Sequence, residues 1–356
     1  MRSESGASTS PVRLIHTSDD VPGIRRRRSG KGFAYLGPSG RRITDADVIA
    51  RIRHLAIPPA YTDVWICIDP RGHLQATGRD ARRRKQYRYH PEWRTLRDHD
   101  KFARLFEFGR SLPRLRRRLR ADLKLPGLPR DKVLAIVASL LGKTMGRVGN
   151  REYLRENGSY GLTTLRDRHL ALLRGGRARL SFRGKSGQPH ELTIDDARLA
   201  RLLRRCQQLP GQQLFQYIDD DGHAQPIDSG MVNDYLQRAT GESFTAKDFR
   251  TWGATALAVE RLARTPLPRT ERLRAGEIVT VVKEVAEVLG NTPAICRKSY
   301  IDPIVFDAWR DGRLQRAAAQ AAGGTLRKTE ALLLRLLKVR TTSRAKSGVS
   351  VVRKRA

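Results

Sequence analysis

Apolar and polar positions follow two different patterns along the chain. In the first hundred residues, the segments GFAYLGPSGRRIT and DVWICIDPRGHLQATG each hold short β-branched or aromatic runs on both sides of a turn rich in Pro and Gly. Such runs predict short antiparallel strands. One helix is expected among them, near residues 45–54. This part of the chain is therefore expected to be a small β-rich domain over residues 21–95.

From residue 98 onward, apolar residues recur every three or four positions, as on the buried face of a helix. Ile278, Val281, Val282 and Val285 give a clear example, in a helix that is expected to stop at Gly290. Helices are expected over residues 98–120, 131–143, 149–157, 198–207, 230–239, 246–263, 276–289, 293–301 and 328–337. One hairpin is expected in ARLSFRGKSGQPHELTI, where apolar and polar residues alternate on both sides of a Gly-rich turn.

These patterns predict an α+β chain with two domains and two tails. Residues 1–20 are rich in Ser and Gly and lack periodicity, so a disordered tail is expected there. The β-rich domain over residues 21–95 precedes a mainly α domain over residues 96–322. A C-terminal helix and a basic tail are expected over residues 323–356.

The composition indicates a polyanionic partner. The chain has 70 Lys and Arg residues against 36 Asp and Glu residues, a net charge of +34. So large an excess favours binding to nucleic acid. A membrane surface is not expected, because the basic residues are spread over the whole chain and no run approaches the roughly 18 apolar residues of a membrane span. The three cysteines form no CxxC pair, which favours a reducing cytoplasmic location.

No metal or nucleotide cofactor is expected. The segment LGKTMG ends like a Walker loop, but Val137 stands where that motif requires its first glycine. Asp219, Asp220 and Asp221 could in principle hold Mg²⁺, although a run of Asp before Gly is more typical of a turn. The sequence has no His and Cys set at zinc spacing.

Tyr300 is the first candidate for chemistry. It lies near the end of a short helix that Thr292 can cap and Pro293 can begin, with Asn291 in the preceding turn. A phenol with a pKa of about 10 is both a usable nucleophile and a usable leaving group on a phosphodiester. Taken alone, such a tyrosine is more often a packing residue.

Three basic residues are further candidates. Arg250 falls in the first turn of a helix, close to Lys247, and Arg147 directly precedes another helix. Lys185 occupies the tip of the expected hairpin. Each of them is, considered singly, an ordinary solvated cation in so basic a chain.

Four segments, taken in their order, resemble the motifs of type IB DNA topoisomerases of the small poxvirus-like class found in bacteria. They are GRVGNREYLRENGSYGLTTL, FRGKSGQPHEL, KDFRTWGA and LGNTPAICRKSYIDP, and the likeness extends over roughly residues 30–315, including GRDARRRKQYRYHPEW. On this resemblance, the first arginine, hairpin lysine, second arginine and nucleophile of the family correspond to Arg147, Lys185, Arg250 and Tyr300. Asn291 stands where many members carry histidine. No histidine follows His223, so that role is not expected to be filled by a neighbour.

The resemblance implies relaxation of supercoiled DNA without ATP or metal, through a 3′-phosphotyrosyl intermediate. The arginines and Asn291 would stabilise the charge on the phosphate, and Lys185 would protonate the departing 5′ oxygen. A monomer that closes as a clamp around duplex DNA, associated with the nucleoid, is expected. The residues expected to contact DNA are Lys85, Gln86, Tyr87, Tyr89, Asn150, Arg151, Tyr153 and Lys247. For the stretch around Tyr87, a buried aromatic strand with solvated arginines is nearly as good an interpretation.

Two alternatives remain open from the sequence. A tyrosine recombinase uses a similar set of residues, but it usually presents His-x-x-Arg, whereas Lys247 lies three residues before Arg250 here. Its N-terminal domain is also helical rather than β-rich. A basic architectural DNA-binding protein would explain the net charge, but it would not explain Tyr300 or the order of the four segments.

Overall fold

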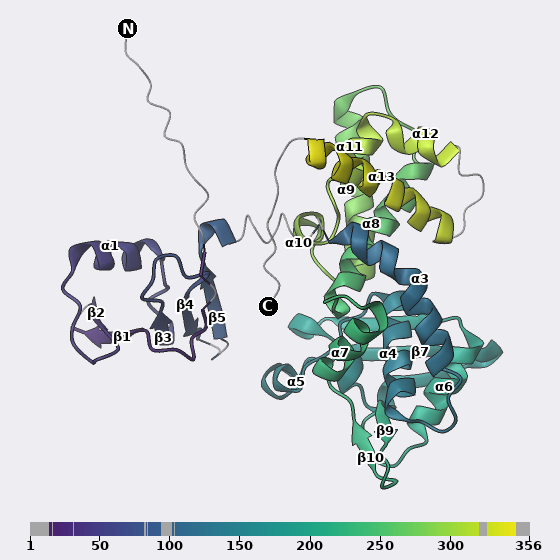
Figure 1. Cartoon of the computed structure of the whole chain (residues 1–356), viewed down its shortest axis with the longest axis horizontal. Coiled ribbons are helices and arrows are strands. Elements are labelled where there is room, and N and C mark those ends of the chain that lie inside the picture. Colours follow the sequence, from purple (N-terminus) through teal and green to yellow (C-terminus); the bar gives the residue numbers. More distant parts are fainter. Residues whose placement is uncertain are drawn as a thin grey trace. The chain divides into compact units, whose positions relative to one another are not determined.

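The computed structural model describes residues 14–15, 17–30, 32–81, 83, 85–93, 102, 104–319 and 326–346. The chain divides into two compact units, Met1–Lys101 and Phe102–Ala356 (Figure 1). The small unit is mainly an antiparallel sheet, and the large unit is mostly helical. The expected α+β class is confirmed.

The small unit is built on a five-stranded antiparallel sheet. Its order across the sheet is β2 (Gly32–Leu36), β1 (Ile24–Ser29), β3 (Thr62–Ile66), β4 (Leu74–Arg79) and β5 (Lys85–Tyr89). The expected helix is α1 (Ala46–His54), and the side chain of Asp45 caps it by accepting hydrogen bonds from two backbone N–H groups. Ile52 of α1 packs on Ile24, Val64 and Ile66 of the sheet, which forms the core of this unit.

Strand β1 was not expected, because its sequence is a run of arginines. Arg26 is half-buried, and its guanidinium donates to the carbonyl oxygens of Ile57, Pro58 and Tyr61 at 3.2, 3.0 and 2.6 Å. The half-buried guanidinium of Arg26 is thus hydrogen-bonded to backbone carbonyl oxygens, which makes an arginine acceptable at this position of the strand. The strand expected after Gly40 is reduced to a single bridge between Leu36 and Arg42.

Contacts of the small unit extend into the segment that was expected to be a disordered tail. Ile15 forms a bridge with Gly72, and the N–H of Thr17 donates to Nδ1 of His73 at 3.0 Å. Residues 17–20 therefore lie against the sheet, where Asp19 also accepts from the hydroxyl of Thr77. They fall within the tail that was expected to be disordered. Residues 1–13 and 16 of that expected tail lie outside the described residues.

The large unit surrounds one buried helix. Its helices are α3 (Leu105–Asp122), α4 (Arg130–Thr144), α5 (Arg151–Asn157), α6 (Ala197–Gln207), α7 (Ser229–Thr240), α8 (Ala246–Arg264), α9 (Glu271–Leu289), α10 (Pro293–Ser299), α11 (Ile304–Arg310), α12 (Arg313–Ala319) and α13 (Leu326–Lys346). Ten of the 15 residues of α4 are buried, including every residue from Lys132 to Ala138, and α3, α7 and α8 pack against it. A helix that is apolar on all sides is typical of the centre of a core.

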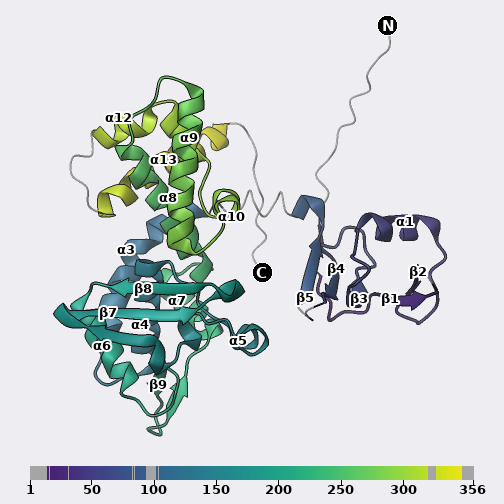
Figure 2. The same cartoon turned by 180° about the vertical axis from the view of Figure 1, so that it is seen from behind.

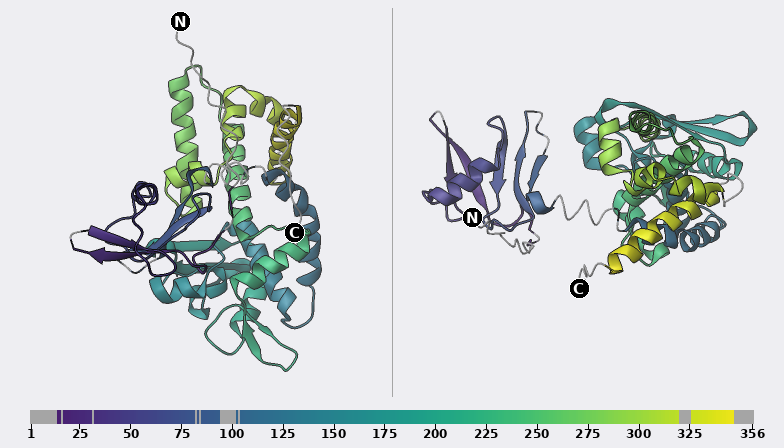
Figure 3. Two further views of the ribbon diagram at one scale, coloured as in Figure 1. Left: turned by 60° about the vertical axis from the view of Figure 1, so that its left-hand side comes forward. Right: turned by 90° about the horizontal axis from the view of Figure 1, so that it is seen from above.

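A three-stranded sheet packs against α4 and α6 (Figure 2). Its order is β6 (Leu170–Leu173), β7 (Arg177–Arg183) and β8 (Pro189–Ile194), and β7 and β8 form the expected hairpin. A second small hairpin joins β9 (Gln216–Ile218) and β10 (Ala224–Pro226). Helix α13 contacts both α3 and α8, so the first and last helices of the large unit lie side by side (Figure 3).

Helices α8, α9 and α10 position the residues around Tyr300. α9 packs on both α8 and α10. It ends at Gly290, whose φ of +58° is the left-handed conformation that glycine adopts readily at a helix end. Thr292 then caps α10 by accepting from the N–H of Ile295, as expected. Two short helices, α11 and α12, were not expected, because seven residues are too few to display a helical period.

Candidate active site

Arg250 is almost completely buried, with 5% of its surface exposed. Its guanidinium donates through Nη1 to the carbonyl oxygen of Met145, and through Nη2 to that of Leu289 at 3.0 Å. The guanidinium carbon lies 5.1 Å from the centre of the Tyr300 ring. The Nε atom is buried and finds no hydrogen-bond partner among the described residues. Arg250 is therefore held rigidly, with its Nε left to donate to another group.

Arg147 contacts the turn that follows α9. Its Nη2 donates to Oδ1 of Asn291 at 2.6 Å and to the carbonyl oxygen of Gly290 at 3.3 Å. Burial lowers the pKa of Arg147, and the charge of Arg250 lowers it further, while Tyr300 acts in the opposite direction. The amide Nδ2 of Asn291 is buried and has no hydrogen-bond partner within the described part of the chain. Asn291 thus also keeps a donor available.

Tyr300 is fixed by its backbone at the end of α10. Its N–H donates to the carbonyl oxygen of Cys296 at 2.9 Å, and its own carbonyl oxygen accepts from the hydroxyl of Thr255 at 3.1 Å. The hydroxyl oxygen of Thr255 also accepts from the N–H of Asp302 at 3.2 Å. Because Thr255 belongs to α8, the same helix orients both Arg250 and Tyr300.

Lys185 is exposed at the tip of the β7–β8 hairpin. Ser186 and Gly187, which follow it, have φ angles of +63° and +75° and make the turn. Lys185, Arg147 and Arg250 line one small cavity. With the contacts of Arg147 to Asn291 and of Arg250 to the Tyr300 ring, the five predicted catalytic residues therefore gather around one place, although they come from four separate segments of the sequence.

His190 of β8 lies at the same cavity and was missed by the sequence analysis. Its half-buried ring stacks on Phe182, with the ring centres 5.5 Å apart. Burial lowers the pKa of His190, and the charges of Arg147 and Arg250 lower it further. The expectation that no histidine lies near Asn291 is wrong, because the fold brings β8 to the turn after α9. In space, the ring of His190 lies against Gly290, directly before Asn291.

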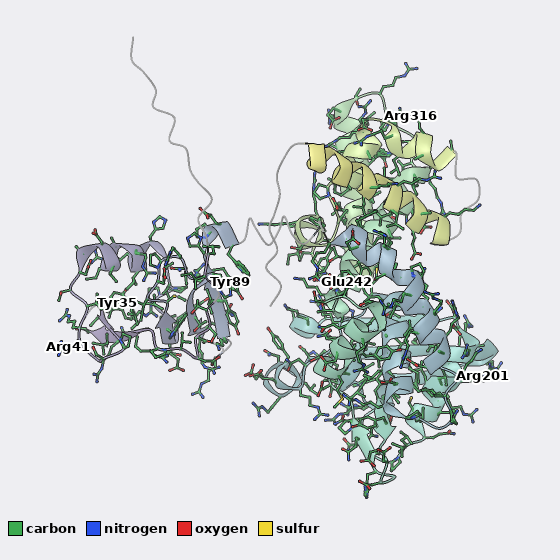
Figure 4. The ribbon with its side chains drawn as sticks, in the orientation of Figure 1. Tyr35, Arg41, Tyr89, Arg201, Glu242 and Arg316 are labelled. Carbon is green, nitrogen blue, oxygen red and sulfur yellow. The ribbon has the colours of Figure 1, made fainter. Side chains whose placement is uncertain are left out.

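The predicted DNA contacts on β5 are divided between its two faces. Lys85, Tyr87 and Tyr89 alternate along the strand and share one face, on which the rings of Tyr87 and Tyr89 stack 6.1 Å apart. Tyr89, on this edge strand of the sheet, is half-buried and packs against Trp65, Cys67 and Leu74 (Figure 4). Lys85 forms an ion pair with Asp19 at 2.7 Å. Gln86 instead donates to Asp80 at 2.9 Å.

The remaining predicted DNA contacts lie at two helix N-termini of the large unit. Asn150 caps α5, because its Oδ1 accepts from the N–H groups of Glu152 and Tyr153 at 2.7 and 3.3 Å. Arg151 and Tyr153 are exposed on the same short helix. Lys247 is exposed in the first turn of α8. Asn150 therefore has a structural role in forming α5 besides any contact with a ligand.

The acidic run considered for Mg²⁺ forms the exposed turn of the β9–β10 hairpin. Ligand atoms of Asp219, Asp221 and His223 lie within 4.8 Å of one another. The carboxylate of Asp219 accepts from the N–H of His223 at 2.7 Å and from the side chain of Gln225 at 2.9 Å. These hydrogen bonds are those expected of an Asp that shapes a turn. None of the five predicted catalytic residues lies on this hairpin.

The chain matches two protein families. Residues 90–310 match the family described as eukaryotic DNA topoisomerase I, catalytic core, and residues 32–80 match bacterial DNA topoisomerase IB, N-terminal domain. The DNA topoisomerase 1B of Acanthamoeba polyphaga mimivirus is 35% identical over 289 residues, which cover 79% of this chain and 85% of that protein. The DNA topoisomerase 1B of vaccinia virus (strain Copenhagen) is 24% identical over 277 residues, covering 73% and 81%. Within the described residues, no helix is long and apolar enough to span a membrane.

Proposed function

The chain belongs to the type IB DNA topoisomerases, enzymes that relax DNA, and from that premise we propose which of its groups carry out the reaction. Tyr300 attacks a backbone phosphate, so that a bond forms between its Oη and phosphorus while the bond to the 5′ oxygen breaks. The products are a 3′-phosphotyrosyl link and a free 5′ hydroxyl. One phosphodiester replaces another, so resealing after strand rotation needs neither ATP nor metal.

The phosphate is held by Arg147, Arg250 and Asn291. Negative charge grows on the two nonbridging oxygens during attack, and guanidinium groups stabilise it because they remain protonated and donate in a planar fork. One observation carries this proposal. Arg250 Nε and Asn291 Nδ2 are buried donors without a partner among the described residues, beside the ring of Tyr300 and the guanidinium of Arg147. Burying an unpaired donor costs about 1–3 kcal/mol, which a bound phosphate would remove.

Lys185 supplies the proton to the leaving 5′ oxygen. An alkoxide is a poor leaving group at neutral pH, so a general acid is needed at this position. Lys185 is supported by its exposure at a hairpin tip and by the cavity that it lines together with Arg147 and Arg250. Asn291 cannot take this role, since its amide has no acidic proton.

We also propose that the two units close as a clamp around duplex DNA. The net charge of +34 would be neutralised by phosphates, and the face of β5 that carries Lys85, Tyr87 and Tyr89 suits sugar and phosphate contacts. Helix α5 would enter the major groove with Arg151 and Tyr153 exposed. All five proposed catalytic groups belong to one chain, which supports action as a monomer. We propose a cytoplasmic, nucleoid-associated location, for which the DNA substrate is the support.

Relaxation of a plasmid without any recombination site tests this proposal. In EDTA and without ATP, both positively and negatively supercoiled plasmid should be converted to relaxed topoisomers. A requirement for Mg²⁺ or ATP would contradict the proposed conservation of the phosphodiester bond. A product of recombined rather than relaxed circles would indicate recombinase chemistry instead.

A further inference from the structure

The imidazole of His190 lies between two backbone segments that are more than a hundred residues apart in the sequence. A Cβ placed on Gly184 would lie 2.2 Å from Cδ2 of His190, and a Cβ placed on Gly290 would lie 2.2 Å from its Cε1. Real side chains do not approach so closely, so the ring fits only because both positions are glycine. Gly184 directly precedes Lys185, and Gly290 directly precedes Asn291.

The turn at Gly290 is anchored without any help from His190. The N–H groups of Gly290 and Asn291 donate to the carbonyl oxygens of Glu287 and Ala286 at 3.0 and 2.9 Å. Arg147 donates to the carbonyl oxygen of Gly290 and to the side chain of Asn291. Arg250 also donates to the carbonyl oxygen of Leu289, the residue before Gly290. In all, five groups at this turn form hydrogen bonds with α9 or with the two arginines.

The hairpin tip is anchored much more weakly. Across the described residues, the hydrogen bonds of Gly184, Gly187 and Gln188 join the tip only to itself and to Arg183. Gly184 donates to Gln188 at 2.8 Å, Gly187 donates to Gly184 at 3.1 Å, and the carbonyl oxygen of Gly187 accepts from Arg183 at 3.2 Å. Among the described residues, the nearest hydrogen bond to another segment is at Arg183, whose carbonyl oxygen accepts from the N–H of Tyr160 at 2.8 Å. The contact of the tip with the turn at Gly290 is made by the ring of His190.

We propose that His190 is a positioning residue, whose ring sets the hairpin tip against the turn at Gly290 so that Lys185 reaches the phosphate held by Asn291 and the arginines. This inference rests on the proposed roles of those groups. Its direct consequence is that loss of the ring should impair the general acid and leave the phosphate-binding groups in place. A neutral ring suits this position, since a cation would be repelled by the guanidinium groups of Arg147 and Arg250.

Single-turnover cleavage of two DNA substrates tests the proposal. One is ordinary DNA, and the other has sulfur in place of the bridging 5′ oxygen, which leaves as a thiolate without needing a proton. On ordinary DNA, His190→Ala should cleave about 10- to 100-fold more slowly than the wild type, the loss expected of a displaced catalytic group. On the sulfur substrate it should cleave at nearly the wild-type rate. Equal slowing on both substrates would overturn the proposal.

Gly184→Ala tests the same contact with His190 still present. The backbone of Gly184 has φ −92°, which alanine adopts without strain, so the added methyl group acts through the ring. Gly184→Ala should therefore be slow on ordinary DNA, normal on the sulfur substrate, and without further effect in a His190→Ala background. Additive losses in the double variant would show that the two residues act independently, contrary to the proposal.

Two controls separate this inference from the proposed function. His223→Ala, in the exposed β9–β10 turn, should match the wild type on both substrates. Lys185→Ala should be slow on ordinary DNA and rescued by sulfur, which verifies the general acid itself. If Lys185→Ala is rescued and His190→Ala is not, the positioning role fails while the proposed function stands. If Lys185→Ala is not rescued either, the proposed general acid is wrong.

Discussion

Asn291→Asp removes one donor from the site at almost constant volume. The Oδ1 atom that accepts from Arg147 at 2.6 Å is retained, while Nδ2, which is buried and unpartnered within the described residues, becomes a second acceptor. Arg147 would then face a carboxylate, and charge-assisted hydrogen bonds are roughly twice as strong as neutral ones. The fold should therefore be as stable as that of the wild type or more so, whereas the phosphate would meet a negative charge in place of an N–H group.

Two effects set the size of the loss. Removing one donor to a developing oxyanion costs about 10²- to 10³-fold in rate, or about 2.7–4 kcal/mol. A carboxylate about 5 Å from a phosphate charge adds about 3 kcal/mol of repulsion at an effective dielectric constant of about 20, which Arg147 partly cancels. The cleavage rate of Asn291→Asp should thus fall by at least about 10³-fold.

The assay is single-turnover cleavage of a duplex that cannot be resealed, with the covalent protein–DNA adduct quantified on a denaturing gel. Thermal unfolding of the same samples checks that stability is retained. Asn291→His is the matched comparison, because a cationic donor at this position should keep or raise the rate. A rate for Asn291→Asp within tenfold of the wild type, in a folded protein that binds DNA, would refute the placement of Asn291 beside the phosphate.

Three further predictions follow from the site and the charge. Lys185→Ala should lose about 10²-fold or more in cleavage rate on ordinary DNA and regain it on the bridging-sulfur substrate, whereas Arg147→Ala and Arg250→Ala should stay slow on both. Burial and the two guanidiniums lower the pKa of His190, so stability present above the ordinary histidine pKa of about 6.5 should be lost as the pH falls below it. The urea midpoint of the wild type should accordingly drop more steeply from pH 7.5 to 5.5 than that of His190→Gln, and parallel curves would contradict this. Duplex binding should weaken steeply with salt, and a flat response would mean that the charge does not serve phosphate contacts.

The sequence predicted most of the elements that carry the candidate site, because their signals are local. The helical period ending at Gly290, the cap at Thr292 and the alternation around Lys185 each lie within about twenty residues. The sequence did not predict strand β1, since the carbonyl oxygens that satisfy Arg26 belong to residues 57–61. It also did not predict the place of His190, because the contact with Gly290 joins segments a hundred residues apart. Long-range contacts of this kind leave no periodic signal in one sequence.

The central claim is that the hydroxyl of Tyr300 forms the covalent bond with DNA. Wild-type protein, Tyr300→Phe and Tyr217→Phe, a control on β9 outside the site, should be incubated with radiolabelled duplex and denatured. The account predicts a labelled covalent adduct with the wild type and with Tyr217→Phe, and none with Tyr300→Phe, although Tyr300→Phe still binds the duplex. An adduct formed by Tyr300→Phe would assign the nucleophile to another residue and contradict the account.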